Sequence, residues 1–254
     1  MEWTSYDKQF LPPVLLGILF LSCLLGILLR RRSPRVRAIP TALIALVLLF
    51  LEVIKQRWNI LGEFDYYLLP FHYCSLFLPV LTLGELCGER LSRIFRPIGT
   101  CMAFVVSVAM YISPDGILGN ATQYFGVGFR ATHTILFHHL VVLYLFLVIA
   151  LRLYRPRLRD ALSVAALGAV YVAIALPLSY RFDTNYCNFL FSEIPPMESL
   201  RLAAGQGIYT ALMTVFLTLG IAIGALLYLA LYRATASLFR AVRRMACRAS
   251  GAEK

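Results

Sequence analysis

Seven long runs of apolar residues dominate the chain, and short polar segments separate them. The runs measure about 17 to 22 residues, which is the length that a helix needs to cross roughly 30 Å of hydrocarbon. They are continuous and rich in leucine rather than alternating, so they predict transmembrane helices and not the strands of a barrel. We place the spans at Leu11–Leu29, Ala38–Ile54, Leu68–Cys87, Pro97–Ile112, Ala131–Leu151, Ala161–Leu178 and Gly205–Tyr232.

The basic residues between the runs predict the orientation of these helices. Segments 30–37, 88–96 and 152–160 and the tail after Tyr232 together hold 18 of the 24 Lys and Arg residues. These segments alternate strictly with others that hold the remaining six, and cytoplasmic loops carry the excess of positive charge. The fold class that we predict is an all-α membrane protein, a compact bundle of seven transmembrane helices with its N-terminus outside and its C-terminus in the cytoplasm.

Composition agrees with a single membrane domain. Sixty per cent of the residues are apolar and 15% are charged, whereas about a quarter of a soluble domain is charged. We assign residues 1–232 to the transmembrane domain and residues 233–254 to a basic cytoplasmic tail. Helical spacing of apolar and basic residues in the tail favours a helix on the anionic lipids of the inner leaflet, with a solvated tail as the alternative.

The net charge of +11 does not indicate nucleic-acid binding, because the arginines lie in short loops beside apolar runs. The N-terminus lacks the basic segment of a signal peptide. The six cysteines form no CxxC motif, so no disulfide framework is predicted. We expect a multi-pass integral membrane protein, located in the cytoplasmic membrane if the source is prokaryotic. The sequence makes no prediction of oligomeric state.

Ionisable groups inside the spans are the candidates for chemistry, because they are costly in a bilayer. Cys74 and His139 lie about 10 Å and 12 Å below the outer ends of the third and fifth spans, at 1.5 Å per residue. They could therefore meet. His138 lies about 100° around the same helix, and periodicity does not choose between the two histidines. Pro70 would suit the first turn of a helix, which places Cys74 one turn in, where the helix dipole favours a thiolate.

The alternatives for these residues are an inert core thiol, hydrogen-bonded structural histidines and a zinc site. A zinc site would need a cysteine, a histidine and Asp115 as three protein ligands with water as the fourth. The histidine spacings of five and one do not form an HxxxH pair. We therefore predict neither a metal nor a cofactor.

Three segments resemble the YwaF/transmembrane protein 164 family of integral membrane proteins. The segment LPFHYC at 69–74 resembles the family's LPLHLC. The second segment runs from SPD at 113–115 to FHHL at 137–140, which resemble the family's TPD and SHG, and the third, TNY at 184–186, resembles its TNY. The resemblance covers roughly residues 60 to 232 and implies a compact seven-helix bundle whose motifs converge near the outer leaflet.

The resemblance also implies an activity. Eukaryotic relatives are described as acyltransferases that move a fatty acyl chain onto a lysophospholipid through a cysteine nucleophile. Carried over by position, Cys74 matches the nucleophile, and His139, with His138 as second choice, matches the family histidine. This chain departs from the family in having His138-His139-Leu140 where Ser-His-Gly is expected.

Two hypotheses for function follow. The first is a lipid-modifying enzyme, a cysteine-dependent phospholipid acyltransferase or lipid hydrolase, with membrane phospholipids as partners and no nucleic acid. The second is a small-solute transporter or ligand-sensing protein that uses the same polar site. The candidate substrate-binding residues in either case are His72, Asp115, Asn185, Tyr186 and Arg130.

Overall fold

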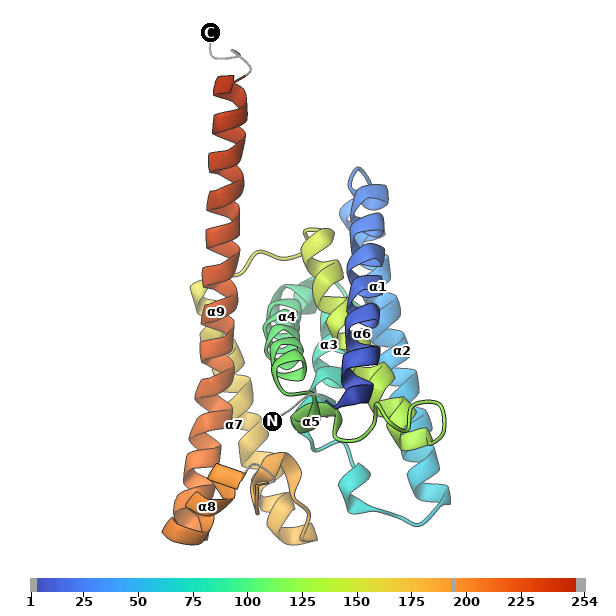
Figure 1. The fold of residues 1–254 in the computed structure, drawn as a ribbon, viewed down its shortest axis with the longest axis vertical. Coiled ribbons are helices and arrows are strands. Elements are labelled where there is room, and N and C mark those ends of the chain that lie inside the picture. The colour runs from blue at the N-terminus through green and yellow to red at the C-terminus, as the bar shows by residue number, and fades with distance from the viewer. Residues whose placement is uncertain (1–3, 193–194, 250–254) are drawn as a thin grey trace.

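The computed structural model describes the backbone of residues 4–192 and 195–249. Seven of its helical segments are long and apolar enough to cross a membrane, and each overlaps one predicted span. The predicted all-α bundle of seven spans is thus confirmed (Figure 1). Six spans are single helices: α1 (Ser5–Leu29), α2 (Pro34–Leu61), α4 (Glu89–Ile112), α6 (Phe129–Ala150), α7 (Leu158–Phe182) and α9 (Gln206–Ala249). The orientation of the bundle in the membrane stays a prediction.

The third span is a broken helix, not the continuous one that the sequence predicts. It consists of two 3-10 turns, η1 (Tyr66–Leu68) and η2 (Tyr73–Leu76), followed by α3 (Phe77–Glu85). Leu69 and His72, between the turns, are extended, with ψ of 152° and 150°. Pro70 disfavours the helical conformation in the residue before it, and it has no N–H of its own. The prediction that Cys74 lies one turn into a helix is therefore wrong, because it lies in the first turn.

Short elements close the loops at the same end of the bundle. They are α5 (Pro114–Leu118), η3 (Tyr186–Asn188) and α8 (Pro195–Ala204). In Figure 1 α5 and α8 lie in the half of the bundle away from the C-terminal end of α9. This is the end at which we predict the outer leaflet.

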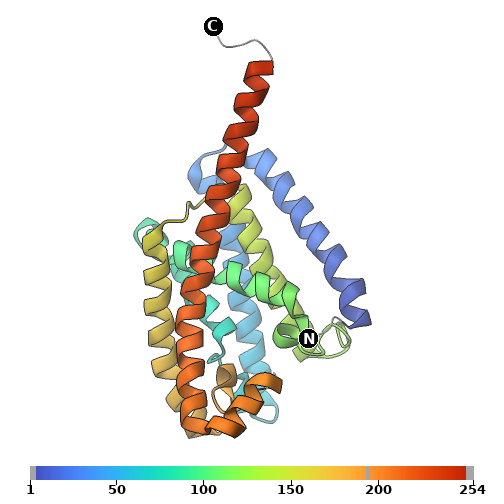
Figure 2. The ribbon, with the colours of Figure 1, turned by 60° about the vertical axis from the view of Figure 1, so that its left-hand side comes forward.

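α6 is the central helix of the bundle. In its most apolar stretch of 18 residues, 61% of the residues are buried, a larger share than in any of the other six spans. The helix packs against α1, α2 and α4. In α1 the same share is 17%, and Figure 2 shows this helix inclined away from the bundle toward its N-terminal end. The histidines of α6, at positions 133, 138 and 139, are consequently all buried in protein.

Four helices meet on one buried carboxylate at the far end of α3. Glu85 is fully buried and accepts hydrogen bonds from Nε and a terminal nitrogen of Arg96, at 2.8 and 2.9 Å. Tyr144 of α6 donates at 2.9 Å and Thr41 of α2 donates at 2.7 Å. Because each oxygen accepts two bonds and one donor is a cation, the charge is compensated in a site where an unpaired carboxylate would cost several kcal/mol. Glu85 thus joins α2, α3, α4 and α6.

α9 runs as one helix through the predicted domain boundary at Tyr232 and extends beyond the other helices (Figure 1). It packs against α7 and α4. A methyl group at Gly224 would lie 2.2 Å from Cγ2 of Val105, so α4 and α9 approach closely at this point. Small residues allow such approaches between membrane helices. The predicted contact of the tail with inner-leaflet lipids falls on side chains after Ser237 and lies outside the described residues.

We expect Glu85→Ala to destabilise the protein by about 3–5 kcal/mol, because it leaves the guanidinium of Arg96 without its carboxylate in a buried site. The measurement is unfolding in detergent micelles. Glu89→Ala is the matched control, since Glu89 is exposed at the start of α4 and should change stability by about 0.5 kcal/mol at most. Equal losses in the two variants would contradict the anchoring role of Glu85.

We expect Gly224→Ala to lower the free energy of unfolding by about 1–3 kcal/mol through overpacking against Val105. Gly220 is the control on the same helix, because a methyl group there meets no atom within 4 Å. Gly220→Ala should be neutral or stabilise by up to about 1 kcal/mol, as alanine favours the helix. Thermal unfolding of both variants checks this, and a stable Gly224→Ala protein would show that α4 and α9 can separate at no cost.

Candidate functional site

A cysteine and a histidine from distant parts of the chain form a pair in the bundle. Sγ of Cys74 in η2 lies 3.2 Å from Nε2 of His138 in α6. Nδ1 of the same imidazole lies 2.8 Å from the carbonyl oxygen of Thr134, one helical turn earlier. A carbonyl only accepts, so Nδ1 carries the proton and Nε2 is free to accept the proton of the thiol. The arrangement is that of a nucleophile, a base and a group that orients the base.

The structure places His138, and not His139, against Cys74. The imidazole of His139 turns toward α1, where its ring centroid lies 5.8 Å from that of Phe10. Its Nδ1 bonds to the carbonyl of Ile135 at 2.8 Å, and Nε2 has no hydrogen-bond partner among the described side chains. Neighbouring residues of a helix point about 100° apart. The sequence matched Cys74 with His139 by their depth below the outer ends of their spans. Depth does not tell which of His138 and His139 points toward Cys74 around the helix.

The position of Cys74 in the first turn of the helix favours its reactivity. It is the second residue of η2, which leads directly into α3. N–H groups at the start of a helix are not used by the helix itself and favour negative charge nearby. A thiolate that forms at this point would therefore be stabilised, whereas the apolar side chains around it favour the neutral thiol.

Side chains satisfy the backbone of the broken span before Cys74. Non-helical backbone at membrane depth needs partners within the protein, since lipid offers none. Four side chains donate to backbone carbonyls here. Tyr186 donates to the carbonyl of Tyr66, His72 to that of Tyr67, Gln56 to that of Leu68 and Tyr171 to that of Phe71. Of these donors, Gln56 and Tyr171 carry no signal in the sequence, because a glutamine or a tyrosine in a span is not unusual.

Three of the candidate substrate-binding residues gather beside this segment. The ring of His72 lies between those of Tyr67 and Tyr186, with centroid distances of 4.4 and 5.2 Å. The guanidinium of Arg130 lies over the ring of Tyr67, 4.9 Å from its centroid. Arg130 also lines an open cavity of 630 Å³, whose other walls are Trp58, Gly62, Glu63, Phe64, Asp65, Tyr66, Leu68 and Thr184. An open cavity with charged and aromatic walls thus lies next to the segment that leads to Cys74.

The other two candidates lie differently. Asn185 organises the loop after α7, since its side chain accepts from the N–H of Leu190 at 3.0 Å and donates to the carbonyl of Phe191 at 3.0 Å. Asp115 is exposed on α5, which packs against α4. The zinc arrangement considered above would need Asp115 beside Cys74. Among the residues that the structure describes, no three His, Cys, Asp or Glu side chains are grouped as metal ligands.

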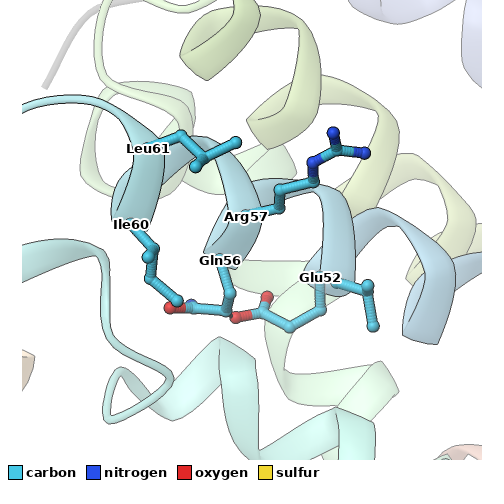
Figure 3. A pocket seen from close by; sticks show the side chains of 6 residues that line it. Glu52, Gln56, Arg57, Ile60 and Leu61 are labelled. Atoms are coloured by element: carbon cyan, nitrogen blue, oxygen red, sulfur yellow. Dashed lines mark hydrogen bonds between the residues drawn. The ribbon is translucent and has the colours of Figure 1, made fainter.

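A buried carboxylate on α2 is linked to the broken span through Gln56, which also donates to the carbonyl of Leu68. Glu52 is 7% exposed, forms a salt bridge of 2.8 Å with Lys55 and accepts from Gln56 at 2.6 Å. Figure 3 shows Glu52 and Gln56 on one face of α2 with their side chains directed toward each other. All the residues that line the 540 Å³ hollow in this view belong to α2, so it does not bring groups from several elements together.

We expect Cys74 to react with a lipid-like thiol probe in membranes, and His138→Ala to slow this reaction about tenfold or more, because the variant lacks the proton acceptor. His139→Ala, the matched control on the same turn of α6, should leave the rate close to wild type. Peptide mass spectrometry measures the labelling of Cys74. A rate that depends on His139 and not on His138 would contradict the pairing.

The comparisons with known proteins agree with this architecture. A family model described as the TMEM164 family matches residues 5–228, from the start of α1 into α9. No curated protein and no solved structure matches the chain. The family match includes all three segments on which the resemblance was based, and it covers well over half of the sequence. The chain therefore belongs to the TMEM164 family.

Proposed function

We propose that this protein is a lipid-modifying enzyme in which Cys74 is the nucleophile and His138 the general base, either a phospholipid acyltransferase or a lipid hydrolase. The observation that carries the proposal is the 3.2 Å contact between Sγ and Nε2, with Nδ1 of the imidazole bonded to Thr134. A thiol needs such a base to attack an ester near neutral pH. The resemblance to acyltransferases of this family, and the lipid that surrounds the bundle, point to an acyl ester as the substrate.

In the first half of the reaction, Cys74 attacks the ester carbonyl of a phospholipid. The bond from sulfur to the acyl carbon forms while the thiol proton moves to Nε2 of His138. The carbonyl oxygen becomes an oxyanion, which the N–H of Cys74 in the first turn of η2 can stabilise. When the carbonyl forms again, the bond to the lipid oxygen breaks. The departing alkoxide takes the proton from Nε2 and leaves as a lysophospholipid hydroxyl, and the acyl chain remains on Cys74 as a thioester.

In the second half, an acceptor hydroxyl attacks the thioester. His138 takes its proton, the bond from oxygen to the acyl carbon forms, and the bond to sulfur breaks. The sulfur then regains the proton from Nε2. A lysophospholipid as acceptor makes the protein an acyltransferase, and water makes it a hydrolase. The two activities share every residue of the dyad.

The surroundings of Cys74 suit a lipid ester. Arg130, which lines the 630 Å³ cavity, offers a guanidinium that matches a phosphate. The Cys74 side chain packs against the apolar core that contains Phe77 and Phe137. A phospholipid has its ester between a charged head group and apolar chains, and the segment that carries Cys74 borders both a cavity with charged residues and an apolar core.

We expect the purified protein, in vesicles of phospholipid with a labelled acyl chain, to form a hydroxylamine-sensitive acyl adduct on Cys74. Cys74→Ala should abolish the adduct and lipid turnover. Cys23→Ala is the control, because Cys23 is an exposed thiol on α1. Added lysophospholipid that takes up the label identifies a transferase, and released fatty acid identifies a hydrolase.

Unchanged turnover in the Cys74→Ala variant would exclude the proposed enzyme. The same polar groups would then be tested as a solute-binding site, which is the second hypothesis from the sequence.

A further inference from the structure

A second thiol lies beside the segment that carries Cys74, although it is far away in the sequence. The N–H of Tyr73 points to Sγ of Cys187 at 3.1 Å. The same sulfur lies 2.7 Å from the hydroxyl oxygen of Tyr171, which in turn lies 2.5 Å from the carbonyl oxygen of Phe71. Two residues that sequence reasoning did not single out thus contact the backbone on both sides of His72.

The directions of these hydrogen bonds follow from what each group can donate. The carbonyl of Phe71 only accepts, so Tyr171 uses its one proton on that bond. The thiol of Cys187 must then donate to the oxygen of Tyr171 while its sulfur accepts from Tyr73. Burial raises the pKa of Cys187 to about 11, so the thiol holds its proton near neutral pH and can donate it. The bonds form a continuous chain from one backbone group to the other.

This series of hydrogen bonds fixes a stretch of backbone that lies outside the helices. Leu69 and His72 are extended, so the Phe71 carbonyl and the Tyr73 N–H, without these partners, would be unpaired groups at membrane depth. Tyr171 belongs to α7, which packs along α9. Cys187 has a left-handed backbone with φ of 50°, rare for a residue with a Cβ atom, in the loop that Asn185 organises.

We propose that Tyr171 and Cys187 are positioning residues that hold the backbone of Phe71–Cys74 so that the Cys74 thiol stays against His138. The inference rests on the proposed function. Neither residue touches the reacting atoms, so neither is catalytic. A shift of about 1 Å in this backbone would lengthen the 3.2 Å contact beyond hydrogen-bond range and slow the chemistry strongly.

The test is a double-mutant cycle on the full-length protein in membranes. Tyr171→Phe, His138→Ala and the double variant are compared by the alkylation rate of Cys74, followed by peptide mass spectrometry across the pH range in which thiols and imidazoles titrate. We expect Tyr171→Phe to lower the rate about tenfold when His138 is present, because the Cys74 thiol is then displaced from the base. In the His138→Ala background it should cause no further loss, and both single variants should show the same pH profile.

Two further variants separate positioning from a general loss of packing. Tyr180→Phe is the matched control, because this tyrosine also lies on α7 but its hydroxyl bonds to Thr210 of α9 at 3.1 Å. It should leave the Cys74 rate unchanged. Cys187→Ser keeps a donor and an acceptor and should retain most of the rate, whereas Cys187→Ala should behave as Tyr171→Phe does. The serine variant also keeps the test valid if Tyr171→Phe does not fold.

Three outcomes would overturn the inference. An equal loss from Tyr171→Phe with and without His138 would show a packing role alone. A wild-type rate in Tyr171→Phe and Cys187→Ala, with a slow His138→Ala, would leave the dyad intact but remove the positioning residues. A Cys74 rate that does not respond to His138→Ala would remove the dyad, and with it both the proposed function and this inference.

Discussion

Backbone groups inside a bilayer must be hydrogen-bonded within the protein, and the break in the third span makes this constraint decisive. A continuous helix would satisfy itself. Here the chain is extended between η1 and η2, and carbonyls of η1 and of Phe71 bond to side chains of α2, α7 and the loop after α7. The helices that pack around the break are those that supply a hydrogen-bond donor at its depth. The segment is therefore held from several directions at once.

The broken span also explains why Cys74 lies where its thiol can react. In a continuous helix its neighbours would use the local N–H groups, and the thiol would be one of several small core side chains. Starting the helix at Tyr73 places Cys74 in the first turn, where the N–H groups are not used by the helix. The proline that disturbs the helix thus has a positive role, which is to expose a helix start inside the bundle.

The two ends of this span are held by opposite means. At the end with Cys74, neutral side-chain donors bond to backbone carbonyls outside the α-helix. At the other end, Glu85 holds four helices through one charge that is fully compensated. A buried ion pair contributes little net stability but is costly to break, so it favours one arrangement of the helices over others. A fixed bundle is what a contact of 3.2 Å between two different spans requires.

The sequence alone determined the class of the protein, the seven spans and the residues worth examining. Apolar runs of membrane-crossing length are local properties, and so are the three motifs, which is why Cys74 and the histidine pair could be named in advance. Only the tertiary structure decided which partners meet. His138 rather than His139 faces Cys74 because of the rotation of α6, and Tyr171, Cys187 and Gln56 reach the broken span because of how α7, the following loop and α2 pack. These contacts join residues far apart in the chain, and a periodicity within one helix carries no information about what lies opposite its face.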